Sequence, residues 1–135
     1  MQNPATYAFA LASDLERTGG GTVYLPGATH ARRYVVGGLI DALAFPTRAD
    51  ALAYLANPRP SSVQGVTVSP FSDFVKRAED AGADAVGVWE DTETGTVYLD
   101  ANSLTDSAWA AIVQARSRGE LAIWDTRAER EIRVS

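Results

Sequence analysis

The sequence contains no cysteine. This absence excludes a disulfide scaffold, a thiolate metal site and a cysteine nucleophile. Lysine is nearly absent too, because Lys76 is the single lysine among 12 basic residues. No apolar run approaches the length of a membrane span, and the N-terminal segment has no basic cluster before an apolar stretch, so neither a membrane protein nor a secretory signal is expected. We therefore expect a cytoplasmic protein that needs no metal and no cofactor.

The chain of 135 residues has the composition of an ordinary globular domain, with 46% hydrophobic and 21% charged residues. This length matches the commonest domain size, so a single domain over residues 1–135 is predicted.

The net charge of −5 is unevenly distributed. Residues 61–106 hold nine acidic side chains against Lys76 and Arg77, whereas the segments on either side are nearly neutral. Direct nucleic-acid binding is disfavoured, because it requires cations that neutralise phosphates. The middle third is therefore an acidic zone.

Turn and capping signals divide the chain into about four helices and six or seven strands. The expected helices start at Pro4, Thr47, Pro70 and Thr105, and the glycines at 19, 82 and 119 close three of them. Short strands are expected at 22–25, 32–36 and 39–45, hairpins near 85–100 and 120–134, and a loop at 57–65. Because hairpins imply antiparallel pairing, the predicted class is α+β.

Alternation of side chains along the predicted strands separates two faces of a sheet. One face is aliphatic, and we expect the third and fourth helices to pack on it; its members are Val86, Val88, Val97, Leu99, Leu121, Ile123, Ile132 and Val134. Trp109, Ile112 and Val113 are expected on the inner side of the fourth helix.

The opposite face gathers Trp89, Tyr98 and Trp124. The favoured interpretation is a second core layer covered by the N-terminal half, because large rings are rarely left bare. The alternative is an exposed aromatic patch used for binding.

No residue pattern demands catalysis. His30 is the only histidine and lies beside Arg32 and Arg33, where a solvated loop is favoured over an anion site. The glycine runs lack the strand-to-helix context of a phosphate loop. The segment 91–95 lacks the later ligands of a calcium loop. The closely spaced carboxylates of the predicted hairpin tip would need a cleft that shifts their pKa values before they could act as acid and base. No catalytic residue is assigned, and the question of an enzyme stays open.

The C-terminal half carries the segment GVWEDTETGTVYLD, then a helix, then RGELAIWD. This order resembles a group of small proteins of uncharacterised function from actinobacteria and their bacteriophages. The matching residues are Gly87, Trp89, Gly95, Val97, Tyr98, Leu99, Asp100, Gly119, Leu121, Ala122, Ile123, Trp124 and Asp125. The residues 101–103 depart from the pattern, and the N-terminal half matches only loosely. The resemblance implies a phage or mobile-element accessory protein that acts by binding a host protein.

Three functions follow as hypotheses. The favoured one is a non-enzymatic protein-binding accessory factor, such as an inhibitor of a host defence enzyme. Its candidate contact residues are Asp80, Asp84, Glu90, Asp91, Glu93, Trp89, Tyr98 and Trp124. The second is a domain that binds a small anionic ligand or nucleotide through His30, Arg32 and Arg33. The third is a structural or oligomeric component that associates through a sheet edge or the aromatic face.

Overall fold

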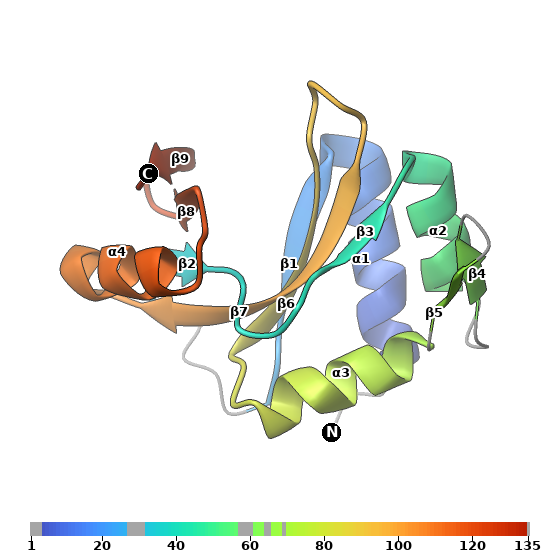
Figure 1. The fold of residues 1–135 in the computed structure, drawn as a ribbon, viewed down its shortest axis with the longest axis horizontal. Coiled ribbons are helices and arrows are strands. Elements are labelled where there is room, and N and C mark those ends of the chain that lie inside the picture. The colour runs from blue at the N-terminus through green and yellow to red at the C-terminus, as the bar shows by residue number, and fades with distance from the viewer. Residues whose placement is uncertain (1–3, 27–31, 57–60, 64–65, 69, 135) are drawn as a thin grey trace.

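The computed structural model describes residues 4–26, 32–56, 61–63, 66–68 and 70–134 (Figure 1). The helices in these residues are α1 (Pro4–Thr18), α2 (Arg48–Ala56), α3 (Phe71–Asp80) and α4 (Ala108–Ser117). The strands are β1 (Gly20–Tyr24), β2 (Tyr34–Val36), β3 (Leu43–Phe45), β4 (Ser61–Val63), β5 (Val66–Val68), β6 (Ala85–Glu90), β7 (Val97–Thr105), β8 (Ala122–Asp125) and β9 (Arg130–Arg133). All their pairings are antiparallel, which confirms the α+β class.

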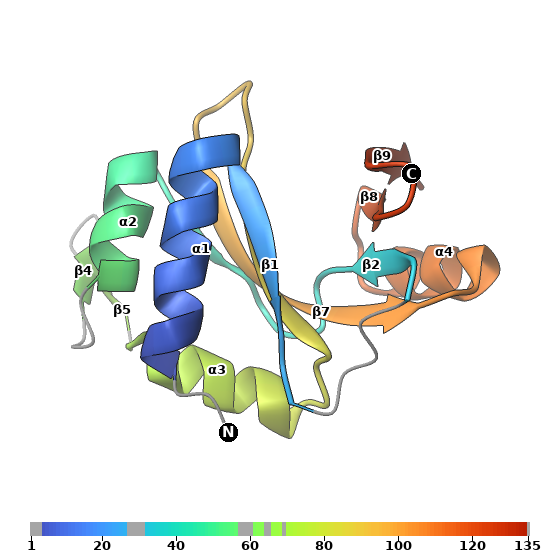
Figure 2. The same ribbon diagram turned by 180° about the vertical axis from the view of Figure 1, so that it is seen from behind.

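The main sheet has the strand order β1-β6-β7-β2-β8-β9, and β3 also pairs with β7. The long strand β7 joins two parts of the molecule. Residues 97–102 of β7 pair with β6, residues 97–99 also pair with β3, and residues 103–105 pair with β2. Figures 1 and 2 show α1, α2 and α3 at one end of the molecule, and α4 with β2, β8 and β9 at the other.

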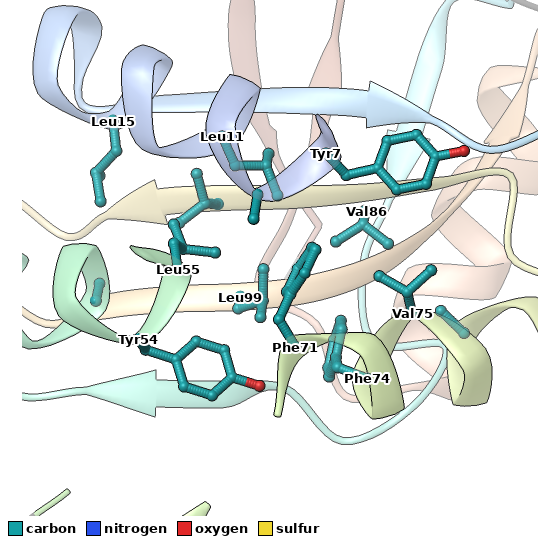
Figure 3. Close-up of a cluster of buried hydrophobic side chains, with 14 of the residues drawn as sticks. Tyr7, Leu11, Leu15, Tyr54, Leu55, Phe71, Phe74, Val75, Val86 and Leu99 are labelled. Carbon is teal, nitrogen blue, oxygen red and sulfur yellow. The ribbon is translucent and has the colours of Figure 1, made fainter. Parts of the chain in front are cut away.

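The larger core lies between α1, α2, α3 and the first part of the sheet. Figure 3 shows Leu11 of α1, Tyr54 of α2 and Phe74 of α3 arranged around the sheet residues Val86 and Leu99. Leu11 and Phe74 are fully buried. The aliphatic face predicted for β6 and β7 is therefore confirmed. The helices that cover it here are α1, α2 and α3, whereas only the third and fourth helices were expected.

A smaller core lies under α4. It contains Tyr34, Val36, Ala111, Ala115, Ile123 and Val134. The expected inner side of α4 is partly wrong, because Trp109 is 73% exposed and Val113 is 47% exposed, while only Ile112 packs against this core. The two alanines Ala111 and Ala115 face the sheet instead, and side chains this small let the helix approach it closely.

Two local predictions need correction. The segment 57–65, expected to be a loop, contains β4, which pairs with β5 across the dipeptide Gln64-Gly65 of the sequence. A two-residue connection that contains glycine is typical of a hairpin. The cap of α4 is Ser107, whose hydroxyl accepts a hydrogen bond from the Ala110 N–H at 3.1 Å, whereas Thr105 ends β7.

Of the helices that the structure describes, none combines the length and the apolar character needed to cross a bilayer.

Candidate functional site

Trp89 on β6 and Tyr98 on β7 form a stacked aromatic pair. They are opposite each other in the strand register, with ring centroids 4.8 Å apart and ring planes 26° apart. The Trp89 side chain is 46% exposed, and Tyr98 is partly buried. The expectation that the N-terminal half covers the aromatic face is therefore wrong. The N-terminal helices pack instead on the opposite, aliphatic face of these strands.

Small residues flank the aromatic pair on the two neighbouring strands. Gly20 of β1 lies opposite Trp89, and Ala44 of β3 lies opposite Tyr98. Gly87 precedes Trp89 by two residues on the same face and adds no side chain. The two rings thus rise from a low surface that is four strands, or roughly 14 Å, wide. We call this surface the aromatic platform, defined by Trp89, Tyr98, Gly20 and Ala44.

An ion pair on the helix side of the sheet fixes the strand that carries the platform. The Arg48 guanidinium donates from Nε to Glu90 Oε1 at 2.9 Å and from its second terminal nitrogen to Glu90 Oε2 at 3.2 Å. The other terminal nitrogen donates to the backbone oxygen of Glu16, at 3.5 Å. Arg48 therefore ties β6, directly after Trp89, to the ends of two helices.

The loop of the β6–β7 hairpin is also internally bonded. The Asp91 N–H donates to Thr96 O at 2.8 Å, and the Gly95 N–H donates to Asp91 O at 2.7 Å. The Asp91 carboxylate accepts from the Glu93 N–H at 2.9 Å. Gly95 takes a φ of +78°, a conformation that favours glycine. The turn next to the platform is thus held in one shape.

The acidic candidates do not form one surface. Asp80 lies at the end of α3 near Lys76, and Asp84 accepts a hydrogen bond from the Leu104 N–H at 2.9 Å. Both precede β6, whereas Asp91 and Glu93 follow it, and this strand of six residues separates them by roughly 20 Å. Only the latter two lie beside the aromatic platform with carboxylates that pair with no cation in the described structure.

Trp124 is not part of the aromatic platform. It lies on β8 opposite Val35 of β2, and Val35 in turn pairs with Leu104 near the far end of β7. Leu104 is six residues from Tyr98, or roughly 20 Å along the strand. Trp124 is 44% exposed, so the favoured expectation of a covered ring is wrong here too, and Trp124 does not form one cluster with Trp89 and Tyr98.

The two arginines proposed to bind an anion, Arg32 and Arg33, bond to different groups of the protein. Arg33 donates to both oxygens of the buried Asp125, at 2.8 and 2.7 Å, and these hydrogen bonds lower the pKa of that carboxyl well below its usual range. Arg32 is exposed and donates to Leu104 O at 3.2 Å. His30 lies outside the described residues. The Arg33 guanidinium is thus engaged in holding the turn after β8, since the same carboxylate accepts from the Arg127 N–H.

A pair of carboxyl groups that the sequence did not predict meets beside Gly37. A Cβ at this position would collide with the Asp100 carboxylate and lie 2.7 Å from Glu120 Oε1. Asp100 accepts hydrogen bonds from the Gly38 N–H at 3.0 and 3.1 Å. Burial raises the pKa of Asp100, and burial together with the nearby Asp100 charge raises the pKa of Glu120. The paired glycines of the sequence, which leave room for side chains from elsewhere, were the one signal for this contact.

The carboxyl pair has little access for chemistry on a substrate, because Asp100 is only 8% exposed. Within the described ranges, no three histidine or acidic side chains are placed to hold a metal ion. The aromatic platform is therefore the stronger candidate for a functional site.

Comparisons with protein families, with curated proteins and with solved structures give no match to this chain.

Proposed function

We propose that the protein is a non-enzymatic factor that binds another protein through the aromatic platform. The observation that carries this proposal is the stacked pair of Trp89 and Tyr98, which lies on a sheet face that none of the described helices covers. Tryptophan and tyrosine are enriched among the residues that dominate binding energy at protein interfaces.

The rigidity of the platform supports the proposal. Stacking fixes the two rings against each other, and the Arg48–Glu90 pair fixes the strand that carries Trp89. A surface held in its binding shape loses little conformational entropy when it meets a partner. An exposed tryptophan on a mobile loop would lack this advantage.

The charges beside the platform favour a basic partner segment. Asp91 and Glu93 lie at the hairpin tip, and the whole chain has a net charge of −5. An arginine or lysine of the partner could lie over the Trp89 ring, where cation–π attraction is worth about 0.5–2 kcal/mol. The neighbouring carboxylates would add attraction to the same cation. The expected ligand is thus a protein segment that combines basic and apolar side chains.

Exposed aromatic rings on a sheet can also stack nucleobases, which is the basis of the nucleotide hypothesis. Such sites combine the rings with cations that follow the phosphates. The platform has acidic neighbours instead, in Asp91 and Glu93, and Arg33 is engaged with Asp125. The balance of charge therefore favours a protein over a nucleic acid.

The resemblance to actinobacterial and phage proteins suggests a host protein as the partner, for example a defence enzyme that the accessory factor inhibits. An actinobacterial lysate is therefore a suitable source for a capture experiment.

The test compares four versions of the tagged protein as bait: wild type, Trp89→Ala, Tyr98→Ala and Phe9→Ala. Phe9 is the matched control, because it is an aromatic residue of α1 that is 78% exposed and lies outside the platform. We expect one captured protein to be retained by wild type and by Phe9→Ala, and to be lost with both platform variants.

Fluorescence titration with single-stranded DNA and with nucleoside triphosphates tests the competing function. Saturable quenching that disappears in Trp89→Ala would replace the proposal with nucleic-acid or nucleotide binding. Captured proteins that all remain bound to both platform variants would refute the role of the platform.

A further inference from the structure

Strand β9 forms one edge of the main sheet, with β8 as its neighbour in the strand order. Figures 1 and 2 both show it at the periphery of the molecule. Such an edge presents backbone donors and acceptors to any chain that can pair with it.

The hydrogen bonds of β9 determine which residues face outward. The Val134 N–H donates to Leu121 O of the β8 segment at 2.9 Å. Backbone groups alternate in direction along a strand, so those of Ile132 also point toward β8. The N–H and C=O groups of Glu131 and Arg133 therefore point away from the sheet and are available to a second strand.

Only one central register suits a second copy of this strand. In an antiparallel pair, two residues opposite each other either both direct their backbone groups at the partner strand or both direct them away from it. A twofold axis between two copies of β9 therefore lies between two copies of the same residue. Centred on Glu131 or on Arg133, the pairing places like charges opposite each other. Centred on Ile132, it places Glu131 of each copy opposite Arg133 of the other, and the two isoleucines face each other.

The side of α4 nearest the end of β9 carries an exposed tryptophan. Trp109, Ile112 and Arg116 follow one another at spacings of three and four residues, so they share one side of the helix. Arg116 Nε donates to Val134 O at 3.0 Å, and Ile112 packs against the same core as Ile132, which places this side next to β9. Trp109 is nevertheless 73% exposed.

We propose that two copies of the chain associate through β9, in the register centred on Ile132, to form one continuous antiparallel sheet. Glu131 and Arg133 then make two symmetric cross-strand ion pairs, each within a pair of backbone hydrogen bonds. The exposed Trp109 of each α4 shields the joined strands on the helix side. A short edge of this kind buries a small area, so the dimer dissociates in the micromolar range.

This association is independent of the proposed binding function. The aromatic platform lies on β1, β6, β7 and β3, and two strands, β2 and β8, separate β7 from the paired edge. Loss of the dimer thus leaves the capture experiment unaffected, and failure of the capture experiment leaves the dimer unaffected.

Sedimentation equilibrium over a range of concentrations tests the dimer with four proteins: wild type, Glu131→Arg, Arg133→Glu and the double variant that exchanges the two charges. Both residues are exposed, so the fold tolerates the changes, and circular dichroism checks this. Each single variant replaces two attractive pairs with two repulsive ones and should weaken the dimer by about tenfold or more. The double variant restores opposite charges and should restore the dimer.

The variant Trp109→Ala should also weaken the dimer, while it leaves the charge pairs in place. A chain that stays monomeric up to about 1 mM would overturn the proposal, because even weak specific association is populated there. A dimer that all the charge variants form equally well would overturn it as well, since its interface would then lie elsewhere.

Discussion

Replacing Glu120 with glutamine should make the folded protein more stable at neutral pH. The Glu120 and Asp100 carboxylates both reach the space beside Gly37, so their oxygens lie on the order of 5 Å apart. At this distance two like charges repel by about 1–3 kcal/mol, for effective dielectric constants between those of water and of a protein surface. Arg118 offsets part of the repulsion, and Glu120 is partly exposed to solvent. We therefore expect a gain of about 1 kcal/mol, or roughly 4 °C in Tm.

The stability gained by Glu120→Gln should depend on pH. The pKa values of both carboxyl groups are raised in the folded state, so folding is favoured while they are protonated and is opposed as the pH rises past the unfolded value of about 4. The gain from Glu120→Gln should thus be present at pH 7 and absent near pH 3.

Urea denaturation of the wild type and the variant at both pH values measures this difference. Glu93→Gln is the control, because Glu93 lies at the exposed hairpin tip, and its removal should change the free energy of unfolding by less than about 0.5 kcal/mol. A variant that is less stable than wild type at pH 7, or a gain that persists at pH 3, would refute the carboxyl repulsion.

Further substitutions test other parts of the structure. Asp125→Asn should lower stability at pH 7 and flatten the acid dependence of urea denaturation, because the pKa of Asp125 is lowered by Arg33 and its contribution is lost as the pH falls below about 4. Equal acid dependence in both proteins would contradict this. Phe74→Ala should lower the free energy of unfolding by about 3–5 kcal/mol, because the ring is fully buried, whereas Phe9→Ala should lower it by less than about 0.5 kcal/mol; urea denaturation measures both. Gly95→Ala should lower the free energy of unfolding by about 1–2 kcal/mol, because a residue with a Cβ is strained at a φ of +78° even though the surrounding space is open. Thermal denaturation measures this, and an unchanged Tm would contradict the turn geometry.

The sequence predicted the elements and the sheet faces well, because both depend on local periodicity. Alternation in β6 and β7 correctly separated Val86 and Leu99 from Trp89 and Tyr98. Gly82 and Gly119 correctly marked the ends of α3 and α4, since both take positive φ.

Relations between distant segments could not be predicted in this way. The second half of the sequence reads as a hairpin, a helix and a second hairpin, but β2 from the first half inserts between β7 and β8. That insertion brings Gly37 next to Asp100 and Glu120, whose positions in the chain differ widely. Arg48 likewise reaches Glu90 from a separate helix. Alternation gave the aliphatic face but not what lies over the opposite one, so the exposure of the aromatic platform appears only in the folded structure.

The most direct test of the proposed function is the dissociation constant of a protein captured by the wild type, measured by titration calorimetry with purified components. Trp89→Ala should weaken binding by about thirtyfold or more, as expected for a central aromatic contact worth at least about 2 kcal/mol, while Phe9→Ala should leave the constant within about twofold of wild type. A Trp89→Ala variant that binds this partner as tightly as the wild type would contradict the assignment of the aromatic platform as the binding site.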